Sequence, residues 1–135
     1  MRRVFFRWRV VAAASAVAVF ACGNGAYGPG VWLHGDLLPG NLLVVGGLLS
    51  AVIDFGGLAV GDPACDLQPA WHTFSGVSRR RFLDELAVDE ASRLRGRGWV
   101  LSQALSALPY YWATNPGMVR QSRHALAQVL ADGVA

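Results

Sequence analysis

The chain has 135 residues, of which 53% are hydrophobic and only 16% are charged. This balance excludes an intrinsically disordered chain, and the length suffices for one domain with a modest core. The formal net charge of +3 gives no nucleic-acid footprint, because four of the 12 basic residues lie among the first nine positions and the other eight face nine acidic residues. So apolar a domain is expected to need a covering partner or a further lobe.

Residues 1–30 differ from the rest of the chain. A basic opening, the apolar run Val10–Ala21 and then Cys22 follow the order of a secretory signal peptide. The apolar run is too short to predict a membrane span. Three interpretations stay open: a signal or anchor, a packed helix, and a mis-called or degenerate start. We therefore expect an atypical segment over 1–30 and one domain over 31–135.

The segments HGDLLPGN (34–41) and VIDFG (52–56) combine an aspartate, an asparagine five residues later and a second aspartate. In phosphoryl transfer one carboxylate orients and deprotonates a hydroxyl, while an amide oxygen and another carboxylate hold Mg²⁺ against ATP phosphates. Two apolar strands, Leu42–Val45 and Leu48–Phe55, are predicted to meet at a Gly46-Gly47 turn. Such a hairpin would bring the three polar side chains near one another.

After this region the pattern becomes helical. Asp62 as N-cap and Pro63 as first helical residue predict a helix that runs to Phe74. Further helices are expected over 79–86 and 91–108, the latter closed by Pro109, and from Asn115-Pro116 to a cap at Gly133. In the helix over 79–86 the side chains expected to face inward are Phe82, Leu83 and Leu86, and the helix over 91–108 carries the apolar residues Leu94, Trp99, Leu101, Ala104 and Leu105. The predicted fold class is α+β, mostly helical, with a short β-hairpin that carries the catalytic and metal loops.

The run HGDLLPGNLL, then VIDFGG, then GDPACDL resembles the catalytic core of the aminoglycoside phosphotransferase family, relatives of the protein kinases. The three motifs agree in order and spacing, most specifically over residues 31–71, although Leu38 stands where many members carry a second histidine. The resemblance implies the C-terminal lobe of a kinase-like fold and transfer of the γ-phosphate of ATP to a small-molecule hydroxyl. It implies that Asp36 is the catalytic base and that Asn41 and Asp54 bind the cofactors, ATP and Mg²⁺.

The resemblance also assigns structural roles. His34 is expected to hold the loop together through hydrogen bonds of its ring, without being a catalyst. Asp66 is expected to accept hydrogen bonds from the backbone of the catalytic loop, and Asp62 to cap the helix that follows it.

The chain contains no lysine. Kinases of this superfamily grip the α- and β-phosphates with a strand lysine under a covering loop, so we expect the nucleotide-covering lobe to be missing and turnover by this chain alone to be low or absent. The alternative is a non-catalytic, truncated kinase-like lobe, exported or membrane-anchored through residues 1–22. The expected localisation is cytoplasmic, because ATP is a cytoplasmic reagent.

Other readings of the same residues are weaker. A metal-dependent phosphoesterase needs a histidine directly after Gly40-Asn41, where this chain has Leu42, and no Gly-x-Ser-x-Gly elbow supports a nucleophilic hydrolase.

His72 and His124 are expected at the surface or as satisfied polar groups. Free Cys65 is expected to be buried. An acidic patch at Asp84, Glu85, Asp89 and Glu90 could attract a cationic substrate, but solvated helix charge is favoured. Aromatic residues that could line a cleft, or more simply the core, are Trp71, Trp99, Tyr110, Tyr111 and Trp112.

Overall fold

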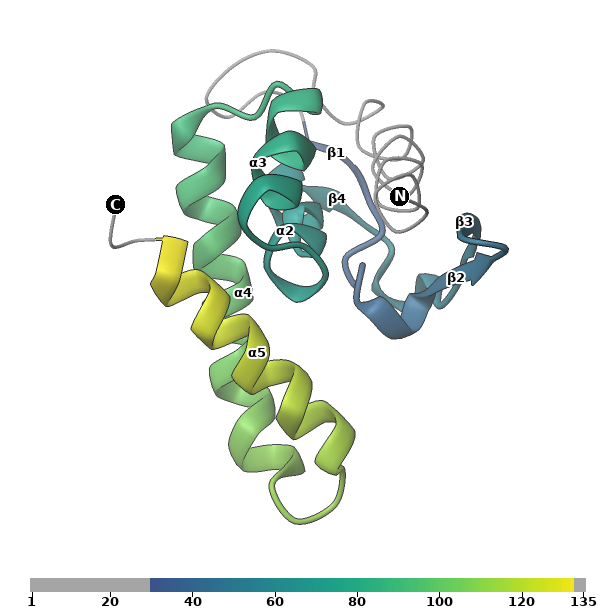
Figure 1. Cartoon of the computed structure of the whole chain (residues 1–135), viewed down its shortest axis with the longest axis vertical. Coiled ribbons are helices and arrows are strands. Elements are labelled where there is room, and N and C mark those ends of the chain that lie inside the picture. The colour runs from purple at the N-terminus through teal and green to yellow at the C-terminus, as the bar shows by residue number, and fades with distance from the viewer. Residues whose placement is uncertain (1–29, 133–135) are drawn as a thin grey trace.

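The computed structural model describes residues 30–132, and Figure 1 shows short strands beside a group of helices. The strands are β1 (Val31–Leu33), β2 (Leu42–Val45), β3 (Leu48–Val52) and β4 (Ala59–Gly61). The 3₁₀ turns are η1 (Pro39–Asn41), η2 (Phe55–Gly57) and η3 (Pro63–Leu67). The helices are α2 (Pro69–His72), α3 (Gly76–Glu85), α4 (Glu90–Tyr111) and α5 (Pro116–Asp132). The predicted α+β class with a helical majority is confirmed.

The strands form two separate antiparallel pairs, β2 with β3 and β1 with β4. The predicted β2–β3 hairpin is confirmed, and Gly46 (φ 57°) and Gly47 (φ 85°) supply the positive dihedrals that a two-residue turn of this kind requires. The second strand was predicted to reach Phe55, but β3 ends at Val52 because Asp54 adopts a left-handed conformation and η2 follows. The β1–β4 pair, with Trp32 opposite Val60, was not anticipated.

The helix predicted from Asp62 to Phe74 begins as expected, but it is split. Asp62 accepts a hydrogen bond from the Ala64 N–H at 3.0 Å, with Pro63 as the first residue of η3. Arg95 of α4 also donates to Asp62, at 2.8 Å. Pro69 then breaks the run, because proline has no N–H to continue the helical hydrogen bonds and its ring clashes with the preceding turn. The result is a 3₁₀ turn followed by the short helix α2.

The three longer helices lie close to their predicted positions, with differences at their ends. Helix α3 begins at Gly76 because Ser75 and Ser78 form a reciprocal cap. Helix α4 is not closed by Pro109: it continues to Tyr111, since a missing N–H near a helix end costs only one hydrogen bond. Asn115 caps α5 through a hydrogen bond from the Met118 N–H at 3.1 Å. The predicted cap at Gly133 lies outside the described residues.

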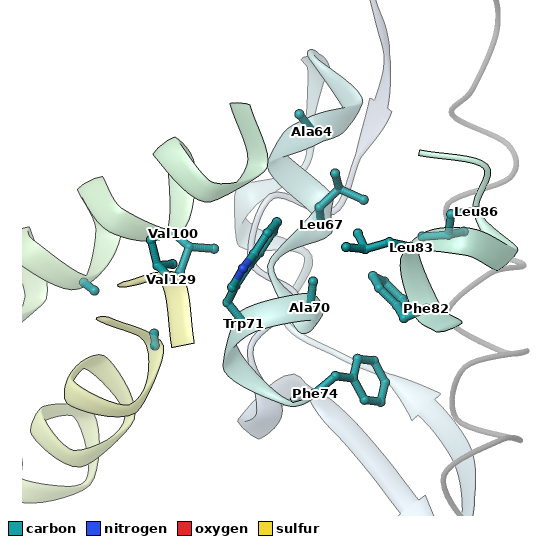
Figure 2. Close-up of a cluster of buried hydrophobic side chains, with 12 residues drawn as sticks. Ala64, Leu67, Ala70, Trp71, Phe74, Phe82, Leu83, Leu86, Val100 and Val129 are labelled. Atoms are coloured by element: carbon teal, nitrogen blue, oxygen red, sulfur yellow. The ribbon is translucent and has the colours of Figure 1, made fainter. Parts of the chain in front are cut away.

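The hydrophobic core lies among the helices and is centred on Trp71, which is 0% exposed (Figure 2). Phe74 and Phe82 pack against each other with ring centroids 5.1 Å apart. The cluster contains Ala64, Leu67, Ala70, Trp71, Phe74, Phe82, Leu83, Leu86, Val100, Ala104, Ala125 and Val129. It therefore joins η3 and α2 to α3, α4 and α5, while no strand residue belongs to it.

Of the apolar residues singled out in the sequence of α4, Ala104 is buried in the core, and the larger ones are not. Its large apolar side chains are exposed, with Leu94 at 53% and Trp99 at 50%, and Leu101 and Leu105 are exposed too. The helix instead buries a row of smaller residues at Gly96, Val100 and Ala104. A Cβ at Gly96 would lie only 3.1 Å from the Leu67 side chain, so the absence of a side chain there lets α4 approach η3 closely.

A buried ionic network ties the end of α5 to the other helices. Asp132 forms salt bridges with Arg79 at 3.2 Å and with Arg93 at 2.7 Å, and it accepts a hydrogen bond from the indole of Trp71 at 3.1 Å. Arg79 also donates to the Ala70 carbonyl at 2.9 Å and to the backbone and side chain of Gln128. Burial raises the pKa of Asp132, but the hydrogen bonds from Arg93, Trp71 and Arg79 together lower it by more than burial raises it. The net shift of this pKa is therefore downward.

The strand half of the molecule has a different surface. In Figure 1 the β2–β3 hairpin stands away from the α4–α5 pair. Its large apolar residues are exposed, as are those of its neighbours: Trp32, Leu43, Val44, Val45, Leu48, Ile53, Phe55, Leu58 and Val60. Among residues 30–132, none of the helices combines the length and apolar character that crossing a membrane requires.

Candidate functional site

The loop after β1 is held by Asp66, a buried residue of η3. Its two carboxylate oxygens accept the backbone N–H groups of His34 at 2.7 Å and of Gly35 at 2.8 Å, which is the structural role predicted for this residue. Gln68 adds a third contact by donating to the Gly35 carbonyl at 3.0 Å. Hydrogen bonds to a charged acceptor are stronger than neutral ones. The core of the helices therefore fixes where this loop begins.

His34 joins the loop to the end of the hairpin, as expected. Its Nδ1 accepts the Asp36 N–H at 3.2 Å, so Nε2 carries the proton and donates to the Ile53 carbonyl at 2.9 Å. The ring also packs on Phe55 with centroids 4.7 Å apart. The two ring nitrogens thus hold the backbone N–H of Asp36 and the carbonyl of the residue before Asp54.

Asp36 and Asn41 contact each other directly. The Asn41 Nδ2 donates to the Asp36 carboxylate at 2.9 Å and to the Asp36 carbonyl at 2.8 Å. The backbone of the same loop is closed by hydrogen bonds from the Leu38 N–H to the Asp36 carbonyl and from the Asn41 N–H to the Leu38 carbonyl. Because Nδ2 donates both of its protons to Asp36, the amide oxygen of Asn41 is the side-chain atom that remains available to bind a cation.

A backbone hydrogen bond brings the residue before Asp54 beside this pair. The Ile53 N–H donates to the Asn41 carbonyl at 3.0 Å. Asp54 itself is exposed and left-handed, with φ 63° and ψ 65°, a conformation that L-residues other than asparagine and aspartate seldom adopt. Its carboxylate is therefore presented to solvent at the end of the hairpin.

The donor set fits magnesium. Mg²⁺ in enzymes that act on nucleotides is held by one or two carboxylate or amide oxygens, with phosphate oxygens and water completing the octahedron. The amide oxygen of Asn41 and the carboxylate of Asp54 provide such a set. Within 30–132 no group of three or more His, Cys, Asp or Glu side chains that could hold a metal ion is found.

A pocket of about 440 Å³ lies beside Asp36. It is formed where the loop after β1, the end of α2 and the facing sides of α4 and α5 meet. Its polar lining comes from Asp36, His72, Gln103, Ser106, Gln121 and Ser122. Its apolar lining includes Leu38 and Met118, and Tyr110 and Tyr111 complete the wall on α4. Volumes of this order are usual for small-molecule sites.

Two of the sequence expectations around this pocket need correction. His72 is not at the surface: it is 7% exposed, and its ring nitrogens make no well-formed hydrogen bond among the described residues, although the side chain of Gln103 lies close enough to oppose the lowering of the ring's pKa by burial. Cys65 is half-buried rather than buried. Burial and the neighbouring Asp66 raise the pKa of the Cys65 thiol, so it stays protonated at neutral pH. A disulfide between Cys65 and Cys22, which the sequence does not favour, cannot be located because Cys22 lies outside the described residues.

The aromatic candidates have different environments. Tyr110 and Tyr111 line the pocket, although Tyr110 is itself largely exposed, whereas Trp71 belongs to the core and Trp99 and Trp112 are exposed away from the pocket. The acidic residues at the end of α3 and the start of α4 do not line the pocket, and Asp89 caps α4 by accepting the Ser92 N–H at 2.6 Å. Solvated and capping charge is therefore the reading that the structure supports for this patch.

A protein-family model matches most of this chain. The model of the phosphotransferase enzyme family, APH, matches residues 5–101, so the match includes much of the N-terminal segment as well as the three motifs. The chain belongs to this family. A comparison with curated proteins gives no match.

Among solved structures, the chain is similar to the ADP-bound aminoglycoside phosphotransferase APH(2'')-Ib, with 16% sequence identity and a TM-score of 0.48. The similarity covers 95% of this chain but only 44% of that one. The chain thus spans less than half the length of this relative, and a likeness of this degree adds nothing about activity to the family assignment.

Sequence reasoning did not find Gln103 and Gln121. Gln103 donates to the Asp36 carboxylate at 3.4 Å, and both glutamines line the pocket. Neither belongs to a motif. On α4 and α5 the buried faces are formed mainly by small residues. Gln103 directly precedes Ala104 and Gln121 directly precedes Ser122 on these faces, and this neighbourhood was the one sequence signal that either glutamine lies close to a buried face.

Proposed function

We propose that this chain carries the hydroxyl-activating and metal-binding part of an ATP-dependent phosphotransferase that acts on a small molecule. The observation that carries the proposal is the Asp36–Asn41 pair, because one hydrogen-bonded unit orients a carboxylate at a pocket and leaves an amide oxygen for a cation. Family membership supports the reaction class.

In this proposal Asp36 acts on the substrate hydroxyl. A hydroxyl held in the pocket donates to the Asp36 carboxylate, which aligns the oxygen and accepts its proton as the new O–P bond forms and the bond to ADP breaks. Asn41 keeps the carboxylate in place through its Nδ2 hydrogen bond, and His34 and Asp66 hold the backbone that presents it. Magnesium bound by Asn41 and Asp54 would neutralise charge on the phosphates.

Calorimetric titration of the purified chain with Mg·ATP tests the metal-binding part. We expect weak binding that is lost in Asp54→Asn, because the substitution removes the charge while asparagine tolerates the left-handed backbone of this position. Asp84→Asn is the matched control, since it removes one exposed carboxylate from α3 and should leave binding unchanged.

Absence of Mg·ATP binding in a folded sample would contradict the proposal and favour the alternative, a non-catalytic lobe. ATP turnover by this chain alone is expected to be low or absent, because no lysine is present to grip the α- and β-phosphates. Robust ATP consumption that disappears in Asp36→Asn would overturn that expectation about turnover while supporting the role of Asp36.

A further inference from the structure

The pocket beside Asp36 contains buried polar atoms without partners. Of the described residues, those that line this pocket and have such atoms are His72 with both ring nitrogens, Gln103 with Oε1 and Gln121 with Nε2, whereas Gln68 Oε1 and Arg97 Nε lie elsewhere. The side chain of Gln103 lies close enough to His72 to oppose the lowering of its pKa by burial, but the two do not form a well-aligned hydrogen bond. A buried polar group without a partner costs free energy, so a cluster of them around one cavity needs a reason. A ligand that completes these hydrogen bonds provides one.

The unpartnered atoms are a mixture of donors and acceptors. Gln121 offers a donor and Gln103 an acceptor, and a neutral imidazole offers one of each. Burial lowers the pKa of His72, and nearby His124 lowers it too, against opposing effects of Gln103 and Asp36, so the ring is neutral at pH 7. Ammonium groups can only donate and carboxylates can only accept, whereas hydroxyl groups do both.

The charge of the pocket points the same way. Asp36 is the one ionisable carboxylate among its lining residues, and that carboxylate already accepts from Asn41. Beyond Asp36 the lining residues offer only neutral acceptors, so the second and third ammonium groups of a polycation would have no charged partner in this pocket. The apolar lining formed by Leu38, Ala107 and Met118, with two tyrosines beside it, suits an uncharged carbon skeleton.

We propose that this pocket selects an uncharged, polyhydroxylated or hydroxyl-bearing compound with an apolar part, rather than a polycation, and that His72, Gln103 and Gln121 are its specificity-determining residues. The proposal rests on the proposed function, since it names the class of hydroxyl compound that Asp36 would receive.

Binding of matched probes to the full chain tests this proposal without requiring turnover. Aryl β-glucosides supply an apolar ring and several hydroxyls, and the corresponding aryl β-glucosaminides replace one hydroxyl by an ammonium group. Saturation-transfer NMR and calorimetry should detect the glucosides and show weaker binding of each glucosaminide by about tenfold or more. Tighter binding of the glucosaminides, or no binding of any pair, would overturn the proposal.

His72→Phe separates ligand recognition from a structural role. It keeps a ring of similar shape and removes both unpartnered nitrogens, so we expect glucoside binding to weaken by about tenfold and the melting temperature to stay equal or rise. His124→Phe is the matched control, because His124 is exposed and does not line the pocket; it should leave glucoside binding unchanged. A lower melting temperature of His72→Phe with unaltered binding would show that His72 is structural and would contradict the proposal.

The outcome is independent of the Mg·ATP titration. Loss of glucoside selectivity with intact, Asp54-dependent Mg·ATP binding would reject the substrate class alone. Glucoside selectivity without Mg·ATP binding would support the pocket assignment and reject the phosphotransferase role of this chain.

Discussion

Trp71 and Trp32 lie in two regions with opposite packing. Trp71, in α2, is 0% exposed and lies at the centre of the helical core, whereas Trp32, in β1, is 73% exposed and faces Val60, which is exposed as well. The helical region contains the hydrophobic core and a buried ionic network, although α4 exposes several large apolar side chains. In the strand region Leu33 is buried, but most of the large apolar residues are exposed.

The candidate site lies where these regions meet, and its members are supported unequally. Asp36 and the pocket are fixed from the helical side through Asp66, Gln68 and the facing sides of α4 and α5. Asp54 depends on the exposed end of a two-stranded hairpin, a unit that is only marginally stable by itself. Under the proposed function, we therefore expect that binding of the hydroxyl compound and binding of the metal can be disrupted separately.

The largest expected effect comes from truncating the two tryptophans. Trp71→Ala should lower the free energy of unfolding by about 3–5 kcal/mol, because it opens a cavity in the core and removes the indole hydrogen bond to Asp132. Trp32→Ala should change it by no more than about 0.5 kcal/mol. Urea unfolding of both variants measures the contrast. Equal losses would show that Trp32 is covered in solution and would remove the distinction between the two regions.

A second prediction concerns the loop that joins them. Gly35 has φ 79°, and a Cβ there would lie 2.4 Å from the Gly57 carbonyl oxygen. Gly35→Ala therefore adds a steric clash to an unfavourable dihedral and should cost about 2–4 kcal/mol. Gly40→Ala, in the same loop, meets no atom within 4 Å and should change stability by less than about 0.5 kcal/mol. Similar unfolding midpoints for the two variants would mean that the loop rearranges freely and is not held against Gly57.

Local motifs and the family resemblance together predicted the polar support of the site well. The role of Asp62 as a cap is confirmed and depends on a short motif. The Gly46-Gly47 turn was predictable for the same reason. The roles of Asp66 and His34 are confirmed too, but they join segments far apart in the sequence and were predictable only from the family resemblance. The assignment of catalytic and metal roles to Asp36, Asn41 and Asp54 stays a prediction.

Packing between distant segments was not predictable in the same way. Helix α4 carries apolar residues on several sides, so its sequence does not reveal that Gly96 and Ala104, rather than Trp99, meet the core. The β1–β4 pair and the contact of Arg79 with Asp132 depend on tertiary placement. His72 was misread because a histidine on a helix carries no local sign that it will be enclosed without partners.

The smallest predicted effect concerns the stability of the helical region at acid pH. The pKa of Asp132 is lowered in the folded state, so its carboxylate stabilises the fold above the unfolded value near 3.8, and this stabilisation is lost as the pH falls through the lower, folded pKa. Asp132→Asn should cost about 1–3 kcal/mol at neutral pH and progressively less below pH 3.8.

Arg93 provides the test of the cause, because its hydrogen bond is the largest of the effects that lower this pKa. Arg93→Gln should therefore shift the acid unfolding midpoint to higher pH. Arg120→Gln removes the same charge from an exposed position on α5 that forms no salt bridge with Asp132 among the described residues, and it should leave the midpoint nearly unchanged. Equal shifts in the two variants would assign the pH dependence to net charge. A shift confined to Arg93→Gln would show that the ionic network around Asp132 sets the acid stability of the helical region.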